Sequence, residues 1–244
     1  MIRPLFFGIL LSVAIVFFTI LLEGGRLLSF LQISSILLIV LGSLGVTMAS
    51  FTREELFQCL KDLGNVITPP DDRNLIPEFE RYWDRARKDG LLSLEEEVGN
   101  MPENFLQKSL QLVVDGTDPN MIEQILTEMS DELEKREFVS AKVFETAGGF
   151  APTLGIIGTV LGLVHVLENL NTGTAALGKG IAIAFIATFY GIGFANLLFI
   201  PIGNQIRSRA RRNASYREAI VKGVLSLQNG DSKRILREKM ETYL

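Results

Sequence analysis

The chain has 244 residues, of which 48% are hydrophobic and 21% are charged, and its formal net charge is −4. So many apolar residues are unusual in a soluble domain and favour a membrane protein. A single His and a single Cys offer no constellation for an enzyme active site and no ligand set for a metal. We therefore expect no catalytic residue, no metal site and no bound cofactor.

Four uncharged apolar runs stand out, and each is long enough to cross a membrane. About 20 helical residues span the ~30 Å hydrocarbon core of a bilayer. The runs are Pro4 to Leu22, Leu27 to Thr52, Thr146 to Leu167 and Gly180 to Ile206. They come in two pairs with only a short polar joint inside each pair, so each pair is predicted to form a helical hairpin.

The first hairpin is predicted over residues 1–51, with spans at about 4–22 and 31–50. A signal peptide is the alternative for its first run, because Arg3 precedes the apolar stretch. Against that alternative, a short Glu-Gly-Gly-Arg joint leads directly into the second run, and no small-x-small cleavage site precedes it. The bulky side chains of both runs suit contact with lipid.

The segment between the hairpins, residues 52–145, is predicted to be an acidic cytoplasmic helical domain. Residues 53–145 hold 22 acidic and 11 basic side chains, a formal charge of −11. Apolar residues recur at three- and four-residue spacing, which is typical of amphipathic helices. Predicted helices cover about 75–88 and 104–114, and another begins at Asp118-Pro119 and continues into the third span. The fold class is therefore an all-α membrane protein with four transmembrane helices.

The second hairpin, residues 146–206, has spans predicted at about 150–168 and 180–202, and both spans are rich in small residues. These are Gly155, Gly158 and Gly162 on the third span and Ala184, Ala187, Gly191 and Ala195 on the fourth. Small residues let helix backbones approach closely in a membrane, and packing within one hairpin is the simpler explanation. Because both spans carry such a face, we interpret them as the inner wall of an assembly.

The tail, residues 207–244, is basic, with ten Lys and Arg residues against four acidic ones. The basic residues near span ends are Arg207, Arg209, Arg211 and Arg212 after the fourth run and Arg53 and Lys61 after the second. Cytoplasmic flanks of membrane spans accumulate Lys and Arg, so both termini and the acidic segment are predicted to be cytoplasmic. The tail is expected to lie against anionic lipid headgroups and not to bind nucleic acid.

Thr159 and Thr188 are the deepest polar residues of the second hairpin. The simpler reading is that each hydroxyl bonds to the carbonyl one turn earlier. The alternative is that both hydroxyls face one pathway and supply oxygen ligands to a cation. No Asp or Glu lies near the middle of any span, so a carboxylate for ion transfer would have to come from another chain. Pro152 and Pro201, at the cytoplasmic rims, are candidate points of flexure.

The order of two hairpins around a helical segment, and the stretches Gly149 to Val164 and Ala184 to Gly191, resemble the MotA/PomA family of flagellar stator subunits. The resemblance covers nearly the whole chain and places it in the MotA/TolQ/ExbB proton channel superfamily. It implies a homopentamer around two copies of a MotB- or PomB-like single-span protein, whose transmembrane Asp supplies the missing carboxylate. It also implies that H⁺ or Na⁺ flow across the bacterial inner membrane rotates this ring and drives the flagellar rotor.

The same resemblance assigns roles to individual residues. Pro152 and Pro201 match family prolines linked to conformational coupling, and the stretch Arg87 to Glu95 matches the segment that contacts the charged rotor protein FliG. The predicted rotor-contact residues are Arg87 and Glu95, supported by Arg85, Lys88, Glu96 and Glu97. Counterparts of Thr159 and Thr188 occur in the sodium-type branch, which favours Na⁺ over H⁺.

Three other functions stay open at this point. An ExbB- or TolQ-like energiser of the outer membrane is disfavoured by the order of the spans. Members of that branch are expected to have three spans with a long segment after the first, whereas this chain has two spans before its long segment. A related ring could power a non-flagellar device, such as a defence or gliding machine. A membrane scaffold without ion flux is the third alternative.

Overall fold

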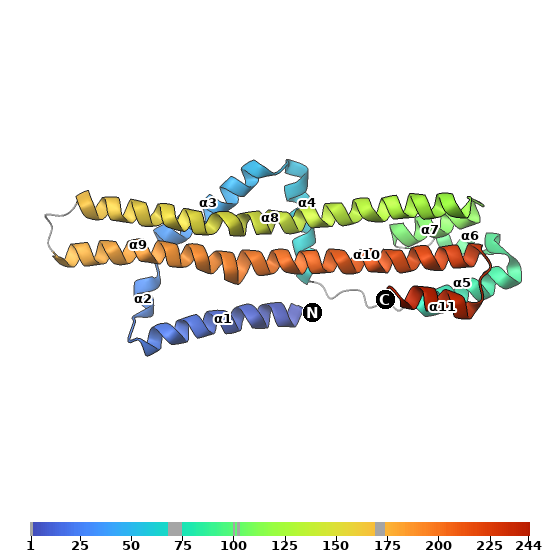
Figure 1. Ribbon diagram of the computed structural model, residues 1–244, viewed down its shortest axis with the longest axis horizontal. Coiled ribbons are helices and arrows are strands. Elements are labelled where there is room, and N and C mark those ends of the chain that lie inside the picture. Colours follow the sequence, from blue (N-terminus) through green and yellow to red (C-terminus); the bar gives the residue numbers. More distant parts are fainter. Residues whose placement is uncertain (1, 68–74, 100, 102, 169–173) are drawn as a thin grey trace. The chain divides into compact units, whose positions relative to one another are not determined.

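The computed structural model describes residues 2–67, 75–99, 101, 103–168 and 174–244, and these residues form helices joined by turns (Figure 1). The α-helices are α1 Ile2–Leu22, α2 Leu27–Phe30, α3 Ile33–Ser50, α4 Arg53–Ile67, α5 Leu75–Asp89, α6 Glu95–Val98, α7 Asn104–Val114, α8 Pro119–Glu168, α9 Thr174–Phe194, α10 Ile200–Gln228 and α11 Lys233–Glu241. A 3₁₀ helix covers Leu91–Leu94, and a π-helix covers Ala195–Phe199. The described residues include no β-strand, so the predicted all-α class is confirmed.

Four of the described helical stretches are long and apolar enough to cross a membrane. They lie in α1, in α3, in α8 and in the continuous helix that runs from α9 through the π-helix into α10. Their positions agree with the four apolar runs of the sequence. On α1, the side chains of Phe6, Phe7 and Leu10 are more than half exposed, as expected for a helix that faces lipid.

The helix that begins at Asp118-Pro119 continues without interruption into the third apolar run. Its start is capped by Asp118, whose carboxylate accepts a hydrogen bond from the Asn120 backbone N–H at 2.9 Å. Pro119 is the first helical residue, where a missing N–H costs nothing. At 50 residues α8 greatly exceeds the length of a membrane span, so the prediction of one helix shared by the acidic segment and the third run is confirmed.

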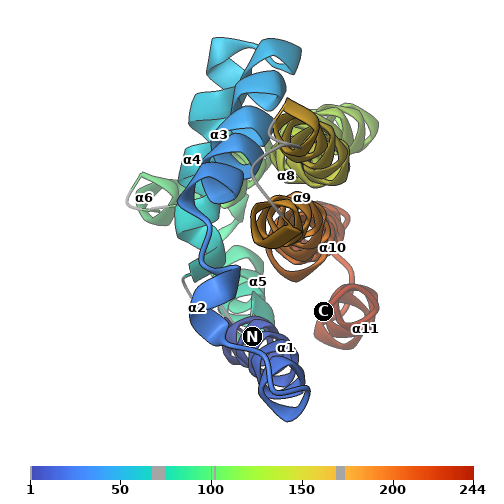
Figure 2. The same cartoon turned by 90° about the vertical axis from the view of Figure 1, so that its left-hand side faces the viewer.

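The chain divides into two compact units. The first unit holds residues 1–69 and 137–207, and the second holds residues 70–136 and 208–244. In the first unit, α9 runs alongside the C-terminal part of α8, and α3 packs against α8 (Figures 1 and 2). The buried face of α3 consists of Ser35, Ile39, Ser43 and Thr47, spaced four residues apart. Small polar residues on this face let α3 approach the hairpin closely.

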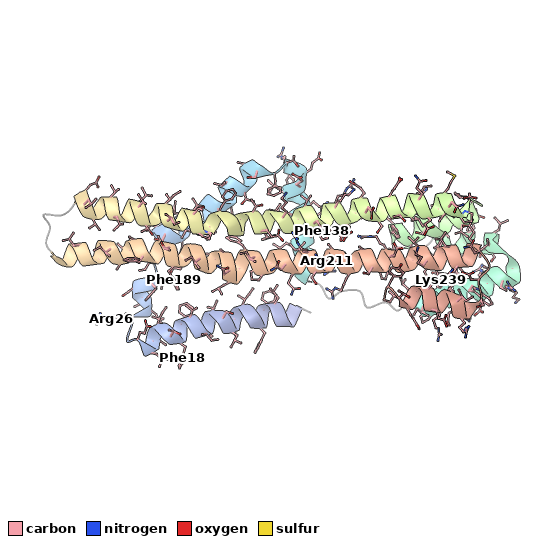
Figure 3. All side chains as sticks on the ribbon, viewed as in Figure 1. Phe18, Arg26, Phe138, Phe189, Arg211 and Lys239 are labelled. Carbon is pink, nitrogen blue, oxygen red and sulfur yellow. The ribbon has the colours of Figure 1, made fainter. Side chains whose placement is uncertain are left out.

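A break separates α2 from α3 within the second apolar run. The backbone of Gln32 is extended, with φ −116° and ψ 100°, so the helix of this run begins only at Ile33. The break leaves the Phe30 carbonyl without its helical partner, and the Tyr190 hydroxyl donates a hydrogen bond to it. Phe189, labelled in Figure 3, packs edge-on against the Phe30 ring at 5.7 Å between centroids. Side chains of α9 therefore stabilise the break.

The second unit has a core built from α5, the 3₁₀ helix, α6, α7, the start of α8, the end of α10 and α11. Its fully buried side chains include Phe79, Leu110, Leu126, Ile220 and Leu236. The Phe79 ring lies directly on Gly223, because a Cβ on Gly223 would come within 2.6 Å of the ring. A side chain larger than hydrogen at position 223 would displace the ring from the core.

This packing gives the tail a structural role within the second unit. Apolar side chains from the last part of α10 and from α11 belong to its core, and their basic side chains pair with acidic residues of the same unit. The ion pairs include Lys222 with Glu123 at 2.9 Å, Lys233 with Asp84 at 2.7 Å and Lys239 with Asp231 at 2.6 Å. Contact of the tail with lipid headgroups stays a prediction.

The only cysteine, Cys59, is buried on α4 against α8 in the first unit. Its sulfur lies 3.6 Å from the Ser140 carbonyl oxygen, and the Ser140 hydroxyl donates to the Asp62 carboxylate at 2.5 Å. Burial, with a smaller effect of Asp62, raises the pKa of the Cys59 thiol to about 11. The thiol is therefore protonated at neutral pH, in agreement with a structural role.

Candidate functional site

Contacts between glycine and alanine hold α8 against α9. A Cβ on Gly155 would lie 3.1 Å from the Ala187 carbonyl oxygen and 3.2 Å from the Gly191 Cα. A Cβ on Gly158 would come within 2.7 Å of the Ala187 Cβ. A Cβ on Gly162 would come within 2.9 Å of the Ala184 Cβ. The two helices are therefore in close contact along about two turns.

These contacts show what the small residues do within one chain. The two small faces lie against each other, so Gly155, Gly158, Gly162, Ala187 and Gly191 pack α8 against α9. The interpretation of the hairpin as the inner wall of an assembly stays a prediction. The outward side chains of the hairpin are bulky and apolar, and Ile156, Val160, Leu161 and Phe185 are each more than half exposed.

The same interface brings Thr159 and Thr188 together. Their hydroxyl oxygens are 2.5 Å apart, and either one could be the donor. The Thr159 hydroxyl also lies 2.9 Å from the Ala184 carbonyl oxygen on α9 and 3.1 Å from the Gly155 carbonyl oxygen one turn earlier on α8. The first reading is supported for Thr159, whose hydroxyl lies within hydrogen-bonding distance of a carbonyl of its own helix. The two hydroxyls also lie together, and a cation pathway past them stays a prediction.

The Thr159–Thr188 cluster contains four oxygen atoms and no titratable group. Two hydroxyls and two carbonyls can line a polar path or share the coordination of a cation, but none of them can carry a proton by titration near neutral pH. In the part of the chain that the structure describes, no three His, Cys, Asp or Glu side chains are placed to hold a metal ion.

Two prolines interrupt backbone hydrogen bonding on the two sides of the hairpin. Pro152 lies inside α8 and cannot donate to the carbonyl one turn earlier. Pro201 is the second residue of α10, two positions after the end of the π-helix Ala195–Phe199. The Ile200 N–H donates a hydrogen bond to the Ala195 carbonyl five residues earlier, which is the π-helical pattern. The change from the α-helical pattern therefore lies next to Pro201, which has no N–H to donate. π-Helical turns are frequent at functional sites, and such irregular turns are where long helices bend.

The predicted rotor-contact residues fall into two groups. Arg85 is held within its own segment, because its guanidinium pairs with Glu97 at 2.8 Å and with Glu96 at 3.2 Å. The hydrogen bond to Glu97 raises the pKa of Arg85 above its ordinary value. These pairs brace the end of α5 against α6, across the turn that Gly90 makes with φ +81°. Arg85, Glu96 and Glu97 thus have a clear intramolecular role.

The second group consists of Arg87, Lys88 and Glu95, which are exposed around the same turn. The Arg87 guanidinium lies over the Trp83 ring, with 5.8 Å between its Cζ atom and the ring centroid. Exposed charges of both signs therefore surround Gly90. This arrangement can form and release ion pairs with a charged partner, because exposed pairs contribute only about 0.2–1 kcal/mol each.

Sequence reasoning missed two contacts that position these sites. Arg207 pairs with Glu145 at 2.8 Å and lies over the Phe138 ring at 5.8 Å, which joins α10 after Pro201 to α8 before Pro152. The Trp83 indole N–H donates to the Asp231 carbonyl at 2.7 Å. Each contact joins residues far apart in the chain, and no local sequence pattern connects them.

Comparison with known proteins agrees with this architecture. Residues 97–219 match the sequence profile of the MotA/TolQ/ExbB proton channel family. The chain is also 31% identical to Motility protein A of Bacillus subtilis, over 97% of this chain and 88% of that protein.

The chain belongs to the MotA/TolQ/ExbB proton channel family.

Other comparisons extend the similarity within this family. Chemotaxis protein PomA of Vibrio alginolyticus is 33% identical over 91% of this chain and 87% of that protein. The flagellar MotAB stator complex from Bacillus subtilis contains a chain that superposes with a TM-score of 0.90 at 29% identity, covering 98% of this chain and 95% of that one. The predicted resemblance to MotA and PomA is therefore confirmed. This member of the proton channel family is a helical membrane protein, and the two relatives compared above are a motility protein and a chemotaxis protein.

Proposed function

We propose that the chain is the MotA/PomA-like subunit of an ion-driven flagellar stator, which converts cation flow into torque on the rotor. The observation that carries this proposal is the match of nearly the whole chain, cytoplasmic helices included, to a subunit of a flagellar MotAB stator complex. The chain also has two apolar helices before its cytoplasmic segment, which disfavours an ExbB- or TolQ-like role.

The proposed assembly is a homopentamer around two copies of a MotB- or PomB-like single-span protein. Two features support a partner of this kind. The Thr159–Thr188 cluster lacks a carboxylate, and a transmembrane Asp of the partner would supply it. The outer faces of α8 and α9 expose bulky apolar side chains, which suit contact with neighbouring subunits or lipid.

The proposed topology has four spans in the bacterial inner membrane and both termini in the cytoplasm. The clusters of Arg and Lys after the second and fourth apolar runs support this orientation. In this arrangement the Gly90 turn, with Arg87, Lys88 and Glu95, lies in the cytoplasm, where a FliG-like rotor protein can reach it. Arg209, Arg211 and Arg212 lie at the membrane surface, near anionic lipid.

In the proposed mechanism the ion passes between the partner Asp and the Thr159–Thr188 cluster. When the ion binds, it neutralises the partner Asp. A neutral side chain costs less free energy than a charged one in contact with the apolar α8–α9 hairpin, so the ring and the partner would shift relative to each other. Pro152 and the Ala195–Phe199 π-helix with Pro201 are the proposed points where the helices bend. Bending there would move the cytoplasmic helices, and the exposed charges near Gly90 would transmit the movement to the rotor.

The proposed function is tested by expressing the chain with its candidate partner in a bacterium that lacks its own stator. Restored swimming, and co-purification with a single-span protein that carries an intramembrane Asp, would support the proposal. Co-purification with such a protein without any swimming would indicate a non-flagellar motor. Failure of both would favour a scaffold without ion flux.

Charge reversal at the rotor contact should impair swimming without preventing assembly. Arg87→Glu places a negative charge where a cation is proposed to meet the rotor, and we expect most of the swimming speed to be lost while the complex still purifies with its partner. The matched control is Arg234→Glu on α11, because the Arg234 side chain is 84% exposed. Cells that carry this control variant are expected to swim normally. Normal swimming of the Arg87→Glu variant would remove this residue from the rotor contact.

The coupling ion is proposed to be Na⁺, because a site with two hydroxyls suits the coordination of a metal cation better than the transfer of a proton. We expect swimming speed to rise with external sodium at fixed pH and fixed ionic strength. Potassium at the same concentrations serves as the control. A flat response to sodium, with a speed that follows the pH gradient instead, would assign H⁺ as the coupling ion.

A further inference from the structure

Trp83 lies between the proposed rotor-contact residue Arg87 and the turn that joins α10 to α11. The face of its ring carries the Arg87 guanidinium, with 5.8 Å between the Cζ atom and the ring centroid. Its indole N–H donates a hydrogen bond to the Asp231 carbonyl oxygen at 2.7 Å. The two contacts use different parts of the indole, so they form together.

The α10–α11 turn holds the accepting carbonyl in a fixed place. Gly230 adopts φ +68°, and the backbone N–H of Asp231 donates to the Ser226 carbonyl at 3.0 Å. The Asp231 carboxylate accepts a hydrogen bond from Lys239 at 2.6 Å, and this contact lowers the pKa of Asp231 below its ordinary value. The turn is therefore tied to the last helix at a second point.

Helix α11 is in turn fixed on α5, the helix that carries Trp83 (Figure 1). Lys233 pairs with Asp84 at 2.7 Å, and Arg237 pairs with Glu80. Leu236 and Met240 of α11 are fully buried in the core, and Lys239, labelled in Figure 3, lies on the same helix. These contacts attach the C-terminal helix to the segment just before the Gly90 turn.

Its place over the Trp83 ring leaves Arg87 well suited to meet a carboxylate. A guanidinium held over an aromatic ring keeps the N–H groups that do not face the ring available for an ion pair. A side chain that is already ordered loses less conformational freedom when it binds. Tryptophan combines a large aromatic face with an N–H donor, so one residue can support Arg87 and be anchored itself.

We propose that Trp83 is a positioning residue for Arg87, anchored by the α10–α11 turn, and that the C-terminal helix is therefore part of the rotor-contact machinery. This inference rests on the proposed function only for the identity of the partner. The stacking and its anchor are properties of the chain alone. They can be tested separately.

The first test uses fluorescence, because Trp83 is the only tryptophan in the chain. In the purified full-length protein, Arg87→Ala should uncover one face of the ring, shift the emission to longer wavelength and increase quenching by acrylamide. The control is Arg234→Ala, which removes an exposed arginine from α11 without touching the ring. The Trp83→Phe variant, which contains no tryptophan, gives the background fluorescence of each preparation. Emission and quenching that are unchanged by Arg87→Ala would overturn the proposed stacking.

The second test is a double-mutant cycle on binding of the purified rotor protein to the stator complex. Trp83→Leu removes both contacts and should weaken binding about two- to fivefold, the effect of losing an exposed cation–π contact. Trp83→Phe keeps an aromatic face and should lose less of the binding affinity for the rotor protein than Trp83→Leu. In an Arg87→Ala background neither change should weaken binding further, because the effect passes through Arg87.

Additive losses in this cycle would show that Trp83 acts on the fold in general and would overturn its positioning role. If Arg87→Ala leaves rotor binding unchanged, the rotor role of Arg87 fails, and with it the claim that the C-terminal helix serves the rotor contact. A fluorescence shift in a chain that never restores swimming would contradict the proposed function while supporting the anchored stack.

Discussion

Adding a single methyl group at Gly191 is expected to disrupt the α8–α9 hairpin. In the structure a Cβ at this position would lie 2.7 Å from the Ala151 carbonyl oxygen and 3.0 Å from the Gly155 Cα. Both neighbours are backbone atoms, so no side-chain rotation can relieve the overlap. Overpacking of this kind costs about 1–3 kcal/mol, and we expect Gly191→Ala to lower the thermal stability and the yield of the complex markedly.

The matched control is Gly193→Ala, two residues further along the same helix. A Cβ at Gly193 would meet nothing within 4 Å, and alanine favours a helix over glycine to the same extent at both positions. We therefore expect Gly193→Ala to express and assemble like the unmodified chain. Equal behaviour of the two variants, measured by thermal unfolding of the purified complexes, would show that the backbones of α8 and α9 are not in close contact.

Removing the hydroxyl of Thr188 is expected to stop ion-driven swimming while the complex still assembles. Thr188→Val keeps the shape of the side chain but removes the oxygen that lies 2.5 Å from the Thr159 hydroxyl. Loss of one oxygen ligand for a desolvated ion costs about 1–3 kcal/mol, a factor of roughly 5–150 in ion occupancy. Thr188 is the better position to test, because the single Thr159 hydroxyl proton can bond to the Ala184 or the Gly155 carbonyl, so that replacing Thr159 would also disturb helix packing.

Thr188→Ser is the matched variant, because serine keeps the hydroxyl and loses only the methyl group. We expect the serine variant to retain most of the ion flux and swimming speed. Both variants should purify in similar amounts with the partner, which separates a transport defect from a folding defect. If the valine variant swims as well as the serine variant, the two hydroxyls serve only to join α8 to α9, and the ion follows another path.

Much of the fold follows from local patterns in the sequence. The predicted helix over residues 104–114 coincides with α7, and the cap at Asp118-Pro119 marks the start of α8. The four apolar runs correspond to the four helical stretches that are long enough to cross a membrane. These features depend on residues close together in the chain, such as a cap, a turn or an uninterrupted apolar run. Neighbouring residues alone are enough to specify them.

The pairing of Thr159 with Thr188 could be anticipated, because two successive spans each carry one deep hydroxyl. The helix against which the small residues pack could not be identified in the same way. A stripe of glycine and alanine shows that some helix packs closely there, but it does not show which one. Only the distances from Gly155 and Gly158 to Ala187 identify the partner as the other helix of the same hairpin.

Local sequence patterns identified the apolar runs that are long enough for a membrane and showed that none of them contains a carboxylate. Which faces meet is seen only in the folded chain: the small faces of α8 and α9, the tail against α5, and Trp83 against the Asp231 carbonyl. The physical reason is that helix formation is a local property, set by backbone hydrogen bonds and side-chain periodicity. The pairing of distant surfaces depends instead on complementary shape and charge, which appear only when the helices are brought together in space.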